Sequence, residues 1–285
     1  MASRNKWQRG FTGTANGGSA LADERVETFA VAGPIEARIV TRCGDISIHS
    51  AEVDQIQVRL TSSGAGDDSL LAEATVEFDP DTKALDIRAG KPRHKNHRTG
   101  PTSSTAWGSW FQIGRSDVDV ELLIPAGSSA TIETVSGSSD LRGTFASVTH
   151  KAASGNLITS GEIASLASAT ASGDLFLDSI TRQLSVTSAS GDVRCASTAS
   201  SNQFKTASGD VDLTAFHTGK LDVRSASGDV RLKVAPGLVV DVDARSVAGS
   251  LESEMPLDSA GSGLGGELLA VTIATVSGDV RILRV

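Results

Sequence analysis

Polar and apolar residues alternate with a period of two along most of this chain, in short runs separated by Gly, Pro, Asp or Ser. Alternation of this kind predicts β-strands with one buried face. In the first part of the chain a short helical turn is expected at 70–74, and Asp79-Pro80-Asp81 is expected to join a hairpin. The strands predicted there cover residues 26–31, 35–41, 45–49, 55–60, 75–78, 84–88 and 117–124.

The later part of the chain repeats one short phrase, Ser-Gly followed by Asp or Asn. The interval between successive glycines is 18 residues from Gly137 to Gly209 and slightly longer afterwards. A fixed period in this range indicates one structural unit stacked many times. The full copies lie at Gly155, Gly173, Gly191, Gly209, Gly228 and Gly278, and weaker copies lie at Gly44, Gly137 and Gly249.

Aligning the repeats on their glycine places apolar residues in columns. Positions two and four after the glycine, and five and seven before it, are mostly Leu, Val, Ile or Phe. Each unit is therefore predicted to be a strand, a Ser-Gly-Asp corner and a second strand. Eighteen residues are too few to include a crossover helix. The expected fold class is all-β, a single-stranded parallel β-solenoid of ~18-residue coils about 4.8 Å apart, preceded by an N-terminal β-rich segment.

The repeated corner has a structural explanation for each residue. Glycine adopts a positive φ and allows close approach between coils, and the Asp side chain can accept hydrogen bonds from backbone amides. A stacked Asp column could instead hold Ca²⁺, but one Asp per coil offers few of the 6–8 oxygens that Ca²⁺ takes. Corner capping is therefore preferred, with no metal. The predicted corner residues are Gly155, Gly173, Asp174, Gly191, Asp192, Gly209, Asp210, Gly228, Asp229, Gly278 and Asp279.

Two further columns support stacking of the coils. Small Ser or Thr residues three positions before the glycine, such as Thr170 and Ser188, are expected to bond along the ladder. Three positions after the glycine, the charges alternate in sequence order as Arg194, Asp212, Arg231, Glu252 and Arg281. Alternation is expected between neighbouring strands because like charges directly opposite each other destabilise a sheet.

The chain divides into three regions. Residues 1–25 are predicted to be a disordered tail, 26–124 an N-terminal β segment with an insertion at 91–115, and 125–285 the Ser-Gly-Asp repeat. A net charge of −8 argues against a nucleic-acid partner. Cys43 and Cys195 are expected to be reduced thiols, with Cys195 in a core column. No transmembrane or signal segment is apparent, so the expected location is cytoplasmic, with association with the cell envelope left open.

The insertion is the predicted interaction loop. It combines a run without acidic residues and two of the three tryptophans in the chain, a combination that can bind a polyanion, an anionic surface or a protein. The alternative is a solvated loop whose aromatic residues pack over the end of the array. The candidate contact residues are Lys91, Arg93, His94, Lys95, His97, Arg98, Trp107, Trp110 and Phe111.

The repeated phrase resembles a bacterial β-strand-repeat family of unknown function whose members are called "putative adhesins". The copies that carry the resemblance include Ala171-Ser172-Gly173-Asp174-Leu175 and Ala189-Ser190-Gly191-Asp192-Val193, and the likeness covers roughly 26–285 except the insertion. The resemblance implies no catalytic residues.

The expected function is a non-enzymatic scaffold that presents its faces to an unknown protein or envelope component, without a cofactor. The alternatives are a self-assembling structural protein and a polysaccharide-active β-helix enzyme, for which the acidic residues would have to gather on one face. The final corner, at Gly278, predicts a terminal rung with an open edge. End-to-end self-association is therefore expected, with Arg281 and Arg284 limiting it and residues 258–267 available to fold over the edge.

Overall fold

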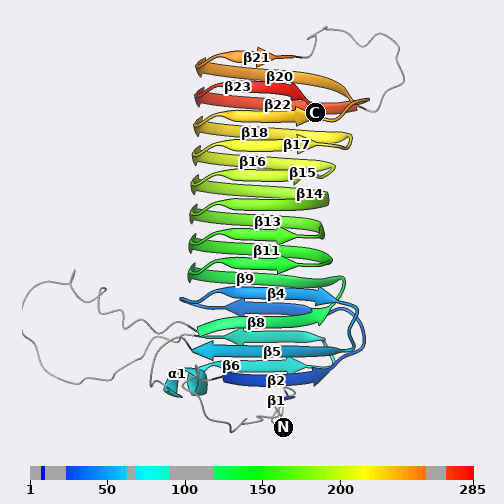
Figure 1. Ribbon diagram of the computed structural model, residues 1–285, viewed down its shortest axis with the longest axis vertical. Helices are drawn as coiled ribbons and strands as arrows, with labels where there is room; N and C mark the ends of the chain where they lie inside the picture. The colour runs from blue at the N-terminus through cyan, green and yellow to red at the C-terminus, as the bar shows by residue number, and fades with distance from the viewer. Residues whose placement is uncertain (1–7, 10–23, 63–67, 90–117, 255–267) are drawn as a thin grey trace, which may run out of the picture.

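The computed structural model describes residues 8–9, 24–62, 68–89, 118–254 and 268–285. Most of this part of the chain is β-strand, with one short helix, which confirms the all-β fold class. Figure 1 shows the strands stacked as successive rungs along one long axis. No helix in the described residues is long and apolar enough to cross a membrane.

Each strand predicted in the N-terminal segment overlaps an observed one. The predicted tail, however, already contains β1, which pairs with β6, and the rest of that tail up to residue 23 lies outside the described residues. The elements are β1 (Gln8–Arg9), β2 (Glu24–Ala30), β3 (Glu36–Val40), β4 (Ile46–Ala51), β5 (Gln55–Ser62), α1 (Asp68–Glu73), β6 (Thr75–Asp79), β7 (Ala84–Arg88) and β8 (Val118–Pro125).

The repeat region contributes two strands per unit, one on each side of the glycine corner. These strands are β9 (Ser128–Ser136), β10 (Ser139–Arg142), β11 (Phe145–Ser154), β12 (Leu157–Ser160), β13 (Glu162–Ser172), β14 (Leu175–Ser190), β15 (Val193–Ser197), β16 (Ser201–Ser208), β17 (Val211–Ala215), β18 (Gly219–Ser227), β19 (Val230–Val234), β20 (Val239–Ala248), β21 (Leu251–Ser253), β22 (Leu268–Ser277) and β23 (Val280–Arg284).

The strands form two ladders that face each other across a narrow apolar core. One ladder runs β2-β5-β8-β4-β10-β12-β14-β15-β17-β19-β23-β21, and the other runs β1-β6-β7-β3-β9-β11-β13-β14-β16-β18-β22-β20. The long strand β14 bends from one ladder into the other. The pairs of the repeat region are parallel.

The register explains the apolar columns of the sequence. Residues 18 apart are direct neighbours, as with Leu166 and Leu184 or Val186 and Phe204. Their side chains are buried between the ladders. Full burial of such a side chain stabilises the fold by roughly 1.5–3 kcal/mol, so each added rung extends the core by several residues.

The N-terminal end departs from the parallel pattern. The pairs β2–β5, β5–β8, β6–β7 and β1–β6 are antiparallel. Phe29 packs on Phe78 across the core, with ring centroids 5.4 Å apart. Arg25 donates hydrogen bonds to the carbonyl groups of Leu71 and Ala74, at the end of α1, and forms an ion pair with the buried Glu27. The inward side chains of the end strand β2, Glu27 and Phe29, are buried at this end of the array.

The order of the last rungs in space differs from their order in sequence. Strand β22 lies between β18 and β20, and β23 lies between β19 and β21. The rung that contains Gly278 is therefore an interior rung, and the rung of β20 and β21 stands at the end, as Figure 1 shows. The expectation that the chain terminus forms the open edge is wrong, and Arg281 lies on a strand that is paired on both sides.

Candidate functional site

The glycine corners form a column of direct backbone contacts between rungs. Gly191 has a φ of +117°, and a Cβ atom added there would overlap the carbonyl oxygen of Gly173 in the neighbouring rung. The same contact joins Gly209 to Gly191 and Gly228 to Gly209. Both the backbone conformation and the close approach therefore require glycine.

The corner aspartates form a second column beside the glycines. Asp174 accepts a hydrogen bond from the backbone amide of Asp192 at 2.9 Å, and Asp210 accepts one from Asp229 at 2.9 Å. The column continues in space from Asp229 to Asp279 at 2.9 Å, and then to the amide of Ser250 at 2.8 Å. Each carboxylate therefore links its own rung to the next one.

Arginine side chains hold the outer side of the same aspartate column. Arg194 contacts Asp192 at 3.2 Å, and Arg281 contacts Asp279 at 3.6 Å. The hydrogen bond from Ser250 lowers the pKa of Asp279 below its ordinary value. Among the described residues no group of three or more His, Cys, Asp or Glu is placed to hold a metal ion. The carboxylates are thus arranged as links between rungs.

The hydroxyl column has its expected role only in part. Thr170 and Ser188 donate to the carbonyl groups of Ser172 and Ser190, each in its own rung, at 3.1 Å. These bonds brace the backbone immediately before the corner instead of running along the ladder. The strand positions next to a sharp corner leave a carbonyl group of the same rung within reach of the hydroxyl. At Ser246 the prediction holds, because its hydroxyl donates to the carbonyl group of Gly278 in the neighbouring rung at 3.2 Å.

The alternation of charges is also interrupted. Arg194 lies opposite Asp212, and Asp212 lies opposite Arg231, as expected. Arg231, however, lies beside Arg281, because the last rung is inserted out of order. Each arginine has its own acidic partner, Asp229 at 3.9 Å for Arg231 and Glu252 at 3.2 Å for Arg281. Local pairs thus replace the expected alternation.

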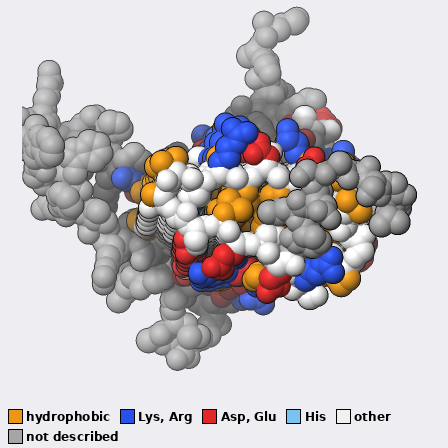
Figure 2. Space-filling view, turned by 90° about the horizontal axis from the view of Figure 1, so that it is seen from above, with side chains coloured by type: hydrophobic (Ala, Val, Ile, Leu, Met, Phe, Trp, Pro, Cys, Tyr) orange, Lys and Arg blue, Asp and Glu red, His pale blue; other side chains and the backbone are white. Residues whose placement is uncertain are grey.

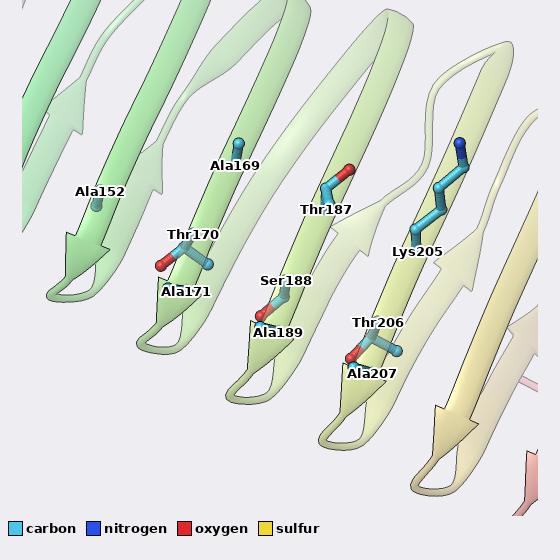
Figure 3. Close-up of a pocket in the computed structure, with 10 residues that line it drawn as sticks. All are labelled: Ala152, Ala169, Thr170, Ala171, Thr187, Ser188, Ala189, Lys205, Thr206 and Ala207. Atoms are coloured by element: carbon cyan, nitrogen blue, oxygen red, sulfur yellow. The ribbon is translucent and has the colours of Figure 1, made fainter.

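The outer surface of the second ladder carries a shallow groove of about 530 Å³ across β11, β13, β14 and β16. Figure 3 shows that its lining is made of small side chains on neighbouring strands, with Lys205 at one side. The alanines of the repeated Ala-Ser-Gly-Asp phrase supply much of the lining: Ala171, Ala189 and Ala207. Because alanine loses no rotamer freedom on contact, this face can pack against another flat surface at little entropic cost.

A second hollow, of about 440 Å³, lies on the outer surface of the opposite ladder. Arg194 lies over the ring of Phe176, 5.3 Å from the ring centroid, and Lys233 pairs with Asp212 at 3.2 Å. The charged side chains of this hollow are therefore already paired within the molecule, which leaves fewer groups to contact a partner.

The predicted interaction loop lies outside the described residues, so its contact residues from Lys91 to Phe111 stay a prediction. The alanine-lined groove was missed in the sequence. The sequence does contain a sign of it, because the alanine two positions before the glycine recurs with the phrase. The alanine alone, however, does not show on which face of the ladder it lies.

Two buried reactive side chains belong to the core. Burial lowers the pKa of His150 to about 4, and its Nδ1 lies 3.1 Å from the hydroxyl of Ser168. Burial raises the pKa of the Cys195 thiol to about 12. A neutral imidazole and a protonated thiol enclosed in the core are not placed to act on a substrate.

The Toastrack DUF4097 family model matches residues 94–283, so the chain belongs to this family of unknown function. The match confirms the resemblance inferred from the repeated phrase. No curated protein matches the chain.

Several solved structures align with almost the whole chain, with low sequence identity and low TM-scores. A "putative adhesin" from Parabacteroides distasonis covers 93% of this chain and 98% of its own, with 12% identity and a TM-score of 0.37. A "putative adhesin" from Bacteroides fragilis covers 93% and 100%, with 9% identity and a TM-score of 0.37. A "putative cell adhesion protein" from Clostridium sporogenes covers 92% and 100%, with 10% identity and a TM-score of 0.30.

Proposed function

We propose that this protein is a non-enzymatic β-solenoid scaffold whose outer face binds a protein or a cell-envelope component. The observation that carries the proposal is the alanine-lined groove, which extends over four neighbouring strands of one ladder. A face of short side chains on a rigid ladder is already ordered before it meets a partner. Lys205, exposed at the edge of the groove, supplies a positive charge for an acidic group of that partner.

The chemistry of the outer faces supports binding over catalysis. The carboxylates at the corners accept hydrogen bonds from backbone amides, so they stand at regular intervals instead of facing each other across a groove. Glycoside hydrolysis needs two carboxyl groups at a fixed short separation across the substrate. Within the described residues, the alanine-lined groove contains Lys205 as its one titratable side chain.

The alternative is a self-assembling structural protein. Open-ended assembly requires that both ends of the array accept another copy. At the N-terminal end the inward side chains of β2, Glu27 and Phe29, are already buried, which does not favour a filament. A closed pair of molecules is compatible with this arrangement.

Affinity capture with matched variants tests the proposal. Ala189→Arg places a long charged side chain in the groove, and Ser160→Arg places the same side chain at an exposed position of β12, on the opposite ladder. Soluble and membrane fractions of the native host are the two sources, so the location of the partner is read at the same time. The proposal expects a species retained by the wild type and Ser160→Arg but lost with Ala189→Arg.

A variant lacking residues 91–115 separates the groove from the predicted loop. Loss of the partner with this deletion but not with Ala189→Arg would assign binding to the loop and contradict the role of the groove. Equal retention of every species by Ala189→Arg and the wild type would do the same. Circular dichroism confirms that each variant keeps its strand content.

A further inference from the structure

The end rung presents a free strand edge. Strand β20 pairs with β22 along one side, and no strand among the described residues pairs with its other side. A β-strand directs alternate backbone amide and carbonyl groups to each side, so the outer groups of β20 are available to another strand.

The core is also open at this end. Val240, Val242 and Ala244 point inward and contact the core, yet they are only half-buried. Their direct neighbours one rung below, Leu269, Val271 and Ile273, are each 2% exposed or less. Figure 2, which looks onto this end, shows hydrophobic side chains between the two ladders. One more layer would give the inward residues of β20 the burial of those below.

The outer face of β20 has a charge pattern that is complementary to itself. Asp243 and Arg245 flank Ala244 and form an ion pair at 3.1 Å. If a second β20 approaches antiparallel with the two Ala244 residues opposite each other, Asp243 of each copy faces Arg245 of the other. The same register places inward residues opposite inward residues, because Val242 then faces Ser246.

We propose that two copies of this chain associate head to head through the β20 edges, as an antiparallel pair centred on Ala244. The inward residues of both β20 strands, Val240 and Val242 among them, become buried against each other, and the ladder that ends in β20 continues from one molecule into the next. The interface is isologous. At the N-terminal end the inward side chains of β2, Glu27 and Phe29, are already buried, so that end exposes no core and the assembly stops at two molecules.

Analytical ultracentrifugation over a concentration series tests the proposal with charge variants. Arg245→Asp places two acidic residues opposite each other at both symmetric positions, and should weaken the dimer by roughly tenfold or more. Asp243→Arg should do the same through two arginines. The double variant Asp243→Arg/Arg245→Asp restores complementarity and should recover the wild-type dimer. An equimolar mixture of the two single variants should form a heterodimer.

Matched controls separate this interface from general effects of charge. Arg224→Asp removes the ion pair with Asp222 on β18, which has the same spacing but lies in an interior strand, and should leave the dimer unchanged. A wild-type protein that stays monomeric at all concentrations overturns the proposal. A dimer that is insensitive to Arg245→Asp overturns it as well.

Discussion

The side chain of Asp192 accepts a hydrogen bond at 3.0 Å from the backbone amide of Asp210, the residue at the same corner of the next rung. This bond joins two corners 18 residues apart and recurs along the array. It makes the corner a link between rungs as well as a turn within one rung. Asp therefore recurs in the repeated phrase because its side chain links each rung to the next one.

Replacing Asp192 should separate its acceptor role from its charge. Asn156 holds the equivalent place toward Asp174, at 2.9 Å, and shows that an amide oxygen can make the same bond. Asp192→Asn should therefore change the free energy of unfolding by less than about 0.5 kcal/mol. Asp192→Ala should lower it by about 1 kcal/mol, because the amide of Asp210 loses its acceptor. Urea denaturation measures both, and equal losses would contradict the link.

The glycine column should be far less tolerant than an isolated glycine with a similar backbone. Gly191→Ala brings a Cβ atom onto the carbonyl group of Gly173, whereas Gly237, with a φ of +92°, has no atom within 4 Å of a Cβ. Gly237→Ala should cost about 1 kcal/mol from backbone strain alone. Gly191→Ala should cost about 4 kcal/mol or more, or prevent folding.

Thermal and urea unfolding of these two glycine variants give the comparison. The difference between them isolates the contact between rungs, since both residues have positive φ. Similar losses of stability in Gly191→Ala and Gly237→Ala would show that the rungs can move apart at the corner, contrary to the close approach described above.

Acid should destabilise the fold through His150. Its pKa is about 4 in the folded protein and about 6.5 in an unfolded chain, because burial disfavours the charged ring. Above pH 6.5 neither state binds the proton, so stability is unaffected. As the pH falls from 6.5 to 4, the unfolded chain binds a proton that the folded state does not, and roughly 3 kcal/mol of stability is lost.

His150→Leu removes this source of acid sensitivity. The free energy of unfolding of the variant should fall less between pH 7 and pH 4.5 than that of the wild type. His49→Gln, at an exposed position of β4, is the matched control and should follow the wild type. Parallel pH curves for the wild type and His150→Leu would show that the ring is not held neutral in the core.

The repeat made much of the fold predictable. Columns such as Leu175, Val193 and Val211 identified the inward positions, and the φ > 0 requirement of Gly191 followed from its recurrence at the corner. The alanine-lined groove was not predicted, because an alanine on a strand has no chemical signature of its own until its neighbours from other rungs are known.

The rung order could not be predicted from the charge column, which favoured Glu252 between Arg231 and Arg281. Exposed ion pairs contribute only tenths of a kcal/mol. The free energy gained by burying apolar side chains is larger. It favours placing the rung with the bulkier inward residues, including Leu269 and Ile273, inside the array. The rung with the smaller Ala244 stands at the end, where part of its surface remains exposed.

This rung order determines which edge is free, and disulfide formation tests it directly. Asp222 and Thr272 are direct neighbours on β18 and β22, whereas Asp222 and Asp243 are separated by an intervening strand. Neighbouring strands lie about 4.8 Å apart, within the range of a disulfide, and strands two apart lie about 9.6 Å apart, beyond it. Cys43→Ser removes the partly exposed native thiol from the background.

In that background, oxidation should give an intramolecular disulfide in Asp222→Cys/Thr272→Cys and in Thr272→Cys/Asp243→Cys, but not in Asp222→Cys/Asp243→Cys. Mass spectrometry of peptides from the monomer fraction reads the result. A disulfide in Asp222→Cys/Asp243→Cys, without one in Asp222→Cys/Thr272→Cys, would show that the rungs follow sequence order and would contradict the free β20 edge.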